Sequence, residues 1–232
     1  MFKSRKVITL ILASGKGSRF GENIPKQFFK IKRKTILEYS IEIFNNHPLV
    51  DEIIIVSIPE FIQKTIRISK KFPKVSKVIP GGATRSISSR NGIAAIENKN
   101  SYILIHDSVR PIVPQQLISI LIENVEETGA VIPCIKSTDT LIKEENQIVK
   151  QFLDRNSILR VQTPQCFKYE IISNAYNLTS NDYIDYPDDS ILVMEKLNIP
   201  IKVIPGSIQN IKLTTKEDIP IISTLLKQYH LT

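Results

Sequence analysis

Six short apolar runs, rich in Ile and Val, recur along the 232-residue chain between longer amphipathic stretches. Because the runs do not alternate with polar residues, they are typical of strands buried on both faces, in a sheet that helices cover on each side. These predicted strands are Val7–Ala13, Glu52–Ser57, Ser76–Ile79, Ser101–His106, Ala130–Ile135 and Ile201–Ile204. The predicted helices are Thr35–Asn46, Glu60–Phe72, Ser86–Ile96, Pro114–Thr128, Tyr169–Leu178, Ser190–Leu197 and Lys216–His230, the last beginning near Thr215. This alternation predicts a three-layer α/β domain with a mostly parallel sheet.

A stretch between residues 136 and 160 interrupts the alternation. Thr140–Lys143 and Ile148–Phe152 flank a polar turn, Glu144–Gln147, and together they predict a hairpin. A two-stranded hairpin has little core of its own and is marginal in isolation, so we expect this arm to pack on something else, such as another subunit. The chain length otherwise favours a single domain over residues 1–232.

The chain is basic, with 31 Lys and Arg residues against 23 Asp and Glu, a formal net charge of +8. Such a balance is typical either of nucleic-acid binding or of a site for small polyanions. The basic residues form short groups, such as Lys32–Lys34 and Lys70–Lys71, and no stripe alternates them with aromatic residues. We therefore expect small polyanionic substrates and no nucleic-acid partner.

The cysteines and the N-terminal segment indicate a cytoplasmic protein. Cys134 and Cys166 are far apart, each among apolar neighbours, and no CxxC or Cys/His cluster with metal spacing is present. We expect both to be buried thiols in a reducing cytosol. The apolar run Val7–Ala13 is too short to cross a membrane, and it leads into a glycine loop rather than a cleavage site, so no membrane partner is expected.

The glycine loop Leu12–Gly21 follows directly after the first predicted strand. Its small residues allow backbone N–H groups to approach phosphate oxygens closely, and a helix that starts after it would add a favourable dipole. The spacing is neither that of a Rossmann fingerprint nor that of a Walker loop. Arg19 and Lys26 add two cations, and Pro25 stiffens the approach. The loop predicts phosphate binding, and the alternative is a tight turn with incidental surface cations.

Two further motifs follow predicted strands. Gly81–Gly92 begins with a glycine pair and continues with Ser and Arg residues at a helix start, which suits a polar ligand, although Ser86 could equally be a helix N-cap. Asp107 ends the fourth strand at the carboxyl edge of the sheet, where α/β enzymes bind ligands, and is a natural Mg²⁺ ligand beside nucleotide phosphates. The alternative is an Asp–Arg salt bridge that closes the strand. His106 is expected to be structural.

Taken together, six segments resemble, in order and spacing, the 2-C-methyl-D-erythritol 4-phosphate cytidylyltransferase family. They are Leu12–Gln27, Gly81–Gly92, Ile105–Pro111, Thr138–Thr140, Asp154–Gln165 and Asn210–Thr215, and the resemblance runs from Val7 to about Leu225. It implies a Rossmann-like nucleotidyltransferase fold with a protruding β-arm, at about residues 136–160, that crosses into the partner of a homodimer.

The resemblance also implies roles for individual residues. The phosphate of a polyol phosphate would attack the α-phosphorus of CTP, and pyrophosphate would leave without a covalent intermediate. Arg19 and Lys26 would stabilise the transition state, and Arg155 and Lys212 would hold the attacking phosphate. Asp107 would hold Mg²⁺. The positions that match CTP contacts are Ala13, Ser14, Gly15, Gly81, Gly82, Arg85 and Ser88, and those on the polyol side are Arg110 and Thr140.

Departures from the family pattern leave the acceptor open. The segment Tyr186–Asp189 carries Pro187 where the family usually has a Thr, and Val109 is similar to the ribitol-5-phosphate cytidylyltransferases. Leu153–Arg155 and Arg160–Gln165 look more like the isoprenoid branch. Methylerythritol phosphate is therefore favoured, with ribitol 5-phosphate as the alternative.

Two alternatives from other classes of protein are weaker. The downstream segments argue against a sugar-1-phosphate nucleotidyltransferase that uses another nucleotide. An inactive nucleotide-binding module would lack Arg19, Lys26 or Asp107, and all three are present.

Overall fold

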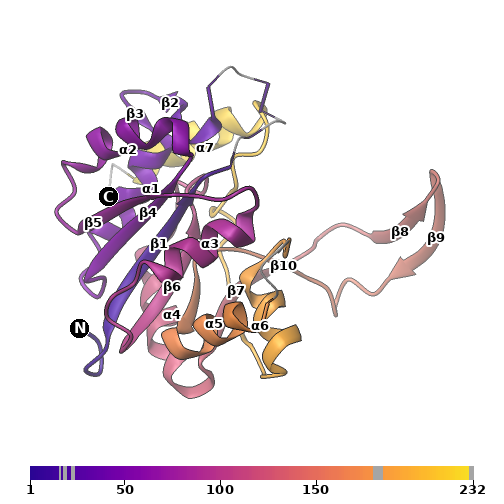
Figure 1. Ribbon diagram of the computed structural model, residues 1–232. Coiled ribbons are helices and arrows are strands. Elements are labelled where there is room, and N and C mark those ends of the chain that lie inside the picture. The colour runs from indigo at the N-terminus through magenta and orange to yellow at the C-terminus, as the bar shows by residue number, and fades with distance from the viewer. Residues whose placement is uncertain (16, 18–19, 22–23, 180–184, 230–232) are drawn as a thin grey trace.

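A mixed β-sheet forms the centre of the molecule (Figure 1). The computed structural model describes residues 1–229 apart from 16, 18–19, 22–23 and 180–184. The strands of the central sheet are β1 (Lys6–Ala13), β4 (Glu52–Ser57), β5 (Val75–Pro80), β6 (Ser101–Asp107), β7 (Ala130–Lys136), β10 (Leu159–Val161), β11 (Gln165–Lys168) and β12 (Lys202–Pro205). Within the described residues the strand order is β10-β7-β11-β6-β1-β4-β5, with β12 paired to β7. All six predicted strands are present.

One half of this sheet is parallel throughout. β1 pairs in parallel with β4 and with β6, and β4 pairs in parallel with β5. β11 lies antiparallel between β6 and β7, while β7 pairs in parallel with β12 and antiparallel with β10. The predicted mostly parallel sheet is confirmed, but the sequence pattern did not predict β10 or β11.

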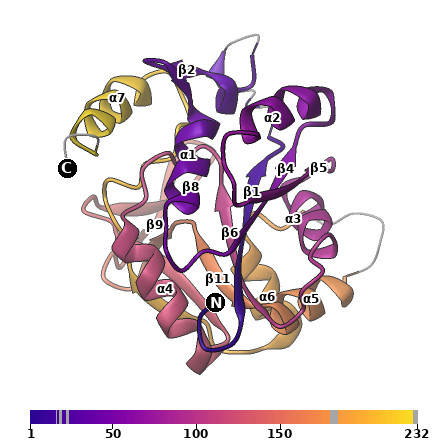
Figure 2. The same ribbon diagram turned by 90° about the vertical axis from the view of Figure 1, so that its left-hand side faces the viewer.

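Helices cover both faces of the sheet, which confirms the three-layer architecture (Figure 2). They are α1 (Ile36–Asn45), α2 (Ile62–Ser69), α3 (Arg85–Ala94), α4 (Gln115–Thr128), α5 (Tyr169–Asn177), α6 (Asp189–Leu197) and α7 (Asp218–Tyr229). Successive side chains of a strand point to opposite faces. Val7 and Ile11 of β1 therefore pack in one core with α1 and α4, whereas Ile8 and Leu10 pack in another with α3, α5 and α6.

The ends of these helices follow from local chemistry. Thr35, predicted as the first residue of α1, is its N-cap, and it forms a capping box in which Thr35 Oγ1 accepts from the Glu38 N–H at 3.2 Å. α4 ends at Gly129, whose positive φ of 76° suits a glycine. Each predicted helix is present, with ends displaced by a few residues. No helix in the described part of the chain is long and apolar enough to span a membrane.

α7 packs at one end of the sheet and fixes the chain segment that precedes it. Ile222 and Leu226 of α7 form a third apolar cluster with Phe20, Ile36 and Leu213. Leu213 also donates its backbone N–H to the Val109 carbonyl oxygen at 2.8 Å. The segment before α7 is thereby held next to the loop that follows β6.

The predicted arm is present as β8 (Leu141–Glu145) and β9 (Ile148–Leu153), an antiparallel pair that projects from the body of the molecule (Figure 1). The turn is shorter than predicted, because β8 runs on to Glu145. Asn146 and Gln147 both have positive φ, 53° and 63°, as a two-residue hairpin turn requires. Most residues of both strands are exposed.

Candidate active site

The carboxyl ends of β1 and β6 and the loop after β5 meet at one edge of the sheet, and a cavity of about 560 Å³ opens there. This is where open α/β sheets place their ligands. Seven of the predicted site residues lie at its wall: Ser14, Gly15, Lys26, Gly82, Arg85, Asp107 and Lys212. The tertiary structure therefore brings together residues from the first, second, third and last motifs.

The two glycine loops are joined through Ser88. Ser14 Oγ donates to Ser88 Oγ at 2.7 Å, and the Gly82 N–H donates to the same oxygen at 3.0 Å. Ser88 is fully buried, so it positions the loops without reaching the cavity. A Cβ on Gly81 would come within 2.4 Å of Ser14 Cβ, which explains why this close approach needs glycine.

The N-cap expectation for Ser86 is wrong. Thr84 caps α3, since its Oγ1 accepts from the Ile87 N–H at 3.2 Å. Ser86 lies within the helix, and its hydroxyl contacts the backbone of Tyr186 instead.

Gln27 is a site residue that sequence reasoning missed. Its Nε2 donates to the carbonyl oxygens of Ala13 at 2.7 Å and Gly15 at 3.1 Å, and its side chain is buried at the cavity wall. It therefore holds the start of the first glycine loop, on both sides of Ser14. Ala13 is itself buried and contributes through its backbone. In the sequence, the feature that could have indicated this role is a polar residue directly after Lys26, which the structure places in the same short helix, Lys26–Phe28.

Asp107 lies at the cavity wall between two cations. Its Oδ2 is 2.7 Å from Lys212 Nζ, and its Oδ1 is 3.3 Å from Arg85 Nε. Burial would raise the pKa of the Asp107 carboxyl, but Arg85 and Lys212 hold this pKa well below its ordinary value. The group is ionised at neutral pH. The predicted alternative, an Asp–Arg ion pair, is thus present, with a guanidinium from α3.

The donor set around Asp107 suits Mg²⁺ bound mainly by phosphates. The described residues hold no group of three or more His, Cys, Asp or Glu side chains that could enclose a metal ion. Mg²⁺ keeps several waters and is usually held by one or two carboxylates plus substrate phosphates. One ionised carboxylate at the wall of a cavity meets that requirement.

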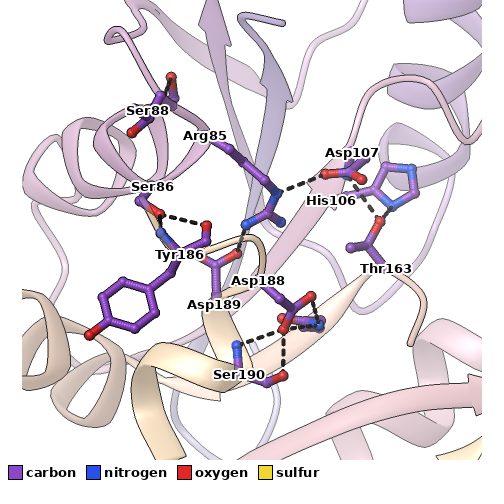
Figure 3. Close-up of polar contacts among 12 residues, drawn as sticks. Arg85, Ser86, Ser88, His106, Asp107, Thr163, Tyr186, Asp188, Asp189 and Ser190 are labelled. Carbon is purple, nitrogen blue, oxygen red and sulfur yellow. Dashed lines mark hydrogen bonds and ion pairs between the residues drawn. The ribbon is translucent and has the colours of Figure 1, made fainter. Parts of the chain in front are cut away.

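Arg85 bridges two carboxylates. Besides its contact with Asp107, its Nη1 is 2.6 Å from Asp189 Oδ2, and Figure 3 shows the guanidinium between the two acids. It was predicted to contact CTP. It lies at the wall of the 560 Å³ cavity, and its ion pairs join that wall to the start of α6.

His106 is structural, as predicted. Its Nε2 lies 3.1 Å from the Arg110 carbonyl oxygen and its Nδ1 lies 3.2 Å from Thr163 Oγ1. Burial lowers the pKa of His106 to about 4, so the ring is neutral. Thr163 Oγ1 also accepts from the Asp107 N–H at 3.1 Å, which fixes the end of β6.

Arg110 lies at a second, adjacent cavity of about 320 Å³. Its Nη1 donates to the Asn210 carbonyl oxygen at 2.8 Å. Arg160 and Lys212 also line this cavity, so Lys212 lies at the border of both. Three cations around one space suit a second anion.

Five predicted site residues in the described part of the chain line neither cavity: Ala13, Gly81 and Ser88 at the glycine loops, and Thr140 and Arg155. Thr140 and Arg155 are exposed at the base of the arm, where Arg155 Nη1 donates to the Thr138 carbonyl oxygen at 3.0 Å. Arg19 lies outside the described residues.

Both predicted thiols, Cys134 and Cys166, are free and buried.

Comparisons with known proteins agree with this geometry. A family model for 2-C-methyl-D-erythritol 4-phosphate cytidylyltransferase matches residues 7–228. A protein of that name from Thermosipho africanus is 37% identical over 219 residues, covering 92% of this chain and 95% of its own. One from Clostridium tetani is 36% identical over 233 residues, covering 99% and 94%. The crystal structure of 4-diphosphocytidyl-2C-methyl-D-erythritol synthase from Anaerococcus prevotii superposes with a TM-score of 0.82 at 28% identity, covering 96% of each chain.

Proposed function

The chain belongs to the 2-C-methyl-D-erythritol 4-phosphate cytidylyltransferase family, and we propose on that basis that it transfers CMP from CTP to 2-C-methyl-D-erythritol 4-phosphate. An oxygen of the acceptor phosphate forms the new bond to the α-phosphorus of CTP. The bond from that phosphorus to the pyrophosphate oxygen breaks, and pyrophosphate leaves. The product is the CDP-polyol that serves the synthesis of isoprenoid precursors.

The observation that carries the proposal is the 560 Å³ cavity, where two glycine loops, Lys26, Asp107 and Lys212 converge. Backbone N–H groups of glycine loops and cations suit a triphosphate. Lys26 follows Pro25, and it lies beside Gly17, where a Cβ would come 3.1 Å from Lys26 Cγ. Lys26 therefore has the position to neutralise charge that builds up on the α-phosphate and on pyrophosphate. Arg19 is proposed to share this role.

Lys212 is placed to serve both substrates. It contacts Asp107 and lies between the nucleotide cavity and the smaller cavity that Arg110 lines. We assign the acceptor phosphate to the smaller cavity, where Lys212 and Arg110 would bind it next to the α-phosphate. Transfer between two anions requires positioning and charge neutralisation more than covalent chemistry.

Asp107 would hold the Mg²⁺ that the proposed reaction uses. Bound Mg²⁺ would polarise the phosphates of CTP and offset part of their negative charge. The ionised state of Asp107, maintained by Arg85 and Lys212, makes it ready to bind a cation at neutral pH.

The position of Thr140 and Arg155 supports a second copy of the chain at the site. Thr140 and Arg155 belong to the projecting arm and line neither cavity of their own subunit. We propose a cytoplasmic homodimer in which each arm brings these two residues to the acceptor side of the partner's site. No nucleic-acid partner is proposed.

Pyrophosphate release with CTP and Mg²⁺ tests the function, with 2-C-methyl-D-erythritol 4-phosphate and ribitol 5-phosphate in parallel assays. We expect release with the first acceptor at a rate at least about tenfold above that with the second, and little release with UTP or GTP. A preference for ribitol 5-phosphate would overturn the acceptor. No release with either would overturn the proposed function.

A further inference from the structure

The segment Tyr186–Asp189, which departs from the family pattern at Pro187, is held on both sides next to the site. Ser86 Oγ donates to the Tyr186 carbonyl oxygen at 2.8 Å, and the Tyr186 N–H donates to Ser86 Oγ at 2.9 Å. The Asp188 carboxylate accepts from Gln165 Nε2 of β11 at 2.9 and 2.7 Å and caps α6 through the Ser190 N–H at 2.9 Å (Figure 3). The backbone around Asp189 is therefore fixed against α3 and the sheet.

Asp189 is fully buried, and both of its oxygens are used. Oδ2 accepts from Arg85 Nη1 at 2.6 Å, and Oδ1 accepts from the Tyr176 hydroxyl at 2.7 Å. A buried carboxylate is costly unless it is paired and hydrogen-bonded, and here both conditions are met. Arg85 Nε then donates to Asp107 Oδ1, so one chain of contacts runs from Tyr176 in α5 to the cavity wall.

Along this chain of contacts, Arg85 stays positively charged between the two carboxylates. Burial would lower the pKa of Arg85, but the carboxylates of Asp189 and Asp107 raise it above its ordinary value. Arg85 therefore remains a cation that pairs with two carboxylates, those of Asp107 and Asp189. A guanidinium that lost Asp189 could turn and pair with Asp107 through two nitrogens, since bidentate pairing is its preferred geometry with a carboxylate. Arg85 would then contact both oxygens of Asp107 and compete with Lys212 for Oδ2.

We propose that Asp189 is a positioning residue for the metal-bearing carboxylate. By holding Arg85 at Nη1, it restricts Arg85 to Oδ1 of Asp107 and leaves Oδ2, which contacts Lys212 at the border of the cavity, without a second contact from Arg85. This inference rests on the proposed function, because it assumes that Asp107 receives the divalent cation that accompanies CTP. Partners that orient a metal ligand commonly matter about 10- to 100-fold for metal affinity or activity.

The test compares Asp189→Asn with Asp188→Asn. Both substitutions remove one negative charge, but Asp188 forms no ion pair with Arg85, and Asn keeps the ability to cap α6. Mn²⁺ binding to each variant in the presence of CTP, without acceptor, is measured by electron paramagnetic resonance. The Mg²⁺ concentration for half-maximal pyrophosphate release is measured alongside, and thermal unfolding reports whether each variant is folded.

We expect Asp189→Asn to weaken Mn²⁺ binding, and to raise the half-maximal Mg²⁺ concentration, by about tenfold or more. Asp188→Asn should stay within about twofold of wild type. A residue that only stabilised the fold would lower Tm without changing the metal dependence, so Mn²⁺ affinity equal to that of the control would overturn the inference.

Tyr176→Phe is the second variant, for the case that Asp189→Asn does not fold. It removes only the hydroxyl that donates to Asp189, and a shift in the same direction of about two- to fivefold is expected, as for one hydrogen bond. An unchanged Mn²⁺ affinity in that variant would also overturn the inference. If wild type released no pyrophosphate, the proposed function itself would fail, whereas wild-type activity with unaltered variants would defeat only the role of Asp189.

Discussion

Lys26 is a cation at the wall of the 560 Å³ cavity. It begins the short helix Lys26–Phe28, and the buried Gln27 next to it is bonded to the glycine loop. The position of Lys26 is thus fixed by its neighbour in the sequence. A group held in this way needs no reorganisation when charge develops on a phosphate, which is the condition for strong electrostatic catalysis.

We expect Lys26→Ala to lower kcat by about 100-fold or more, because it removes a preorganised charge donor. Steady-state pyrophosphate release measures the effect. Lys30→Ala is the matched control, since Lys30 is exposed in the short strand β2 (Lys30–Ile31) and does not line the cavity. Turnover of Lys26→Ala within about threefold of wild type would contradict the role.

Among the secondary-structure elements, α4 is tied to the loop between α1 and β4 through one buried histidine. His47 Nε2 lies 3.2 Å from the Gln115 carbonyl oxygen and 3.1 Å from Ser119 Oγ, and its Nδ1 accepts from the Leu49 N–H at 3.2 Å. Because Nδ1 accepts a hydrogen bond, the ring must be neutral. Burial accordingly lowers the pKa of His47.

This contact makes stability depend on pH. The folded pKa of His47 lies below the value of about 6.5 in the unfolded chain, so the unfolded state binds more protons on the acid side of that value. The contribution of neutral His47 is complete at higher pH and is lost as the pH falls through about 6.5 toward the folded pKa.

Urea unfolding at about pH 7.5 and about pH 5.5 checks this expectation. The free energy of unfolding should fall on acidification, and it should fall less in His47→Asn, which lacks the titrating ring. His106 titrates in both proteins, so the difference between them isolates His47. An equal fall in both would show that His47 is not responsible.

At the scale of the whole molecule, the arm carries apolar side chains that its own subunit does not bury. Phe152 is 72% exposed and Ile148 is 61% exposed, and both lie on β9, a strand with no buried residue. Large apolar side chains gathered on a projecting hairpin are typical of an interaction surface. In the proposed homodimer, the same hairpin also carries Thr140 and Arg155 to the second site.

We expect Phe152→Ser combined with Ile148→Ser to shift the protein from dimer to monomer in sedimentation velocity, with a concurrent loss of activity. Leu178→Ser is the control, because Leu178 is equally exposed, at 59%, but lies at the end of α5 on the body. A dimer that survives the arm substitutions would remove the arm from the interface. A wild-type monomer would refute the homodimer.

The sequence by itself determined the layers of the fold and the edge of the sheet at which the candidate active-site cavity lies. Val7–Ala13 and Ser101–His106 were predictable as strands because short continuous apolar runs rich in Ile and Val favour a sheet buried on both faces. The glycines after β1 and β5 were predictable as ligand loops because they follow strands that end at one edge. The arm was predictable because residues 136–160 did not fit the alternation of apolar strands and amphipathic helices.

Tertiary structure alone decided which distant side chains meet. β11 has only four residues, and its place between β6 and β7 depends on pairing with both neighbours. Arg85 pairs with Asp189, 104 positions away, and Lys212 contacts Asp107 from 105 positions away, and neither pair was predicted. Local sequence encodes burial and periodicity, but the pairing of buried charges depends on packing that brings separate elements together.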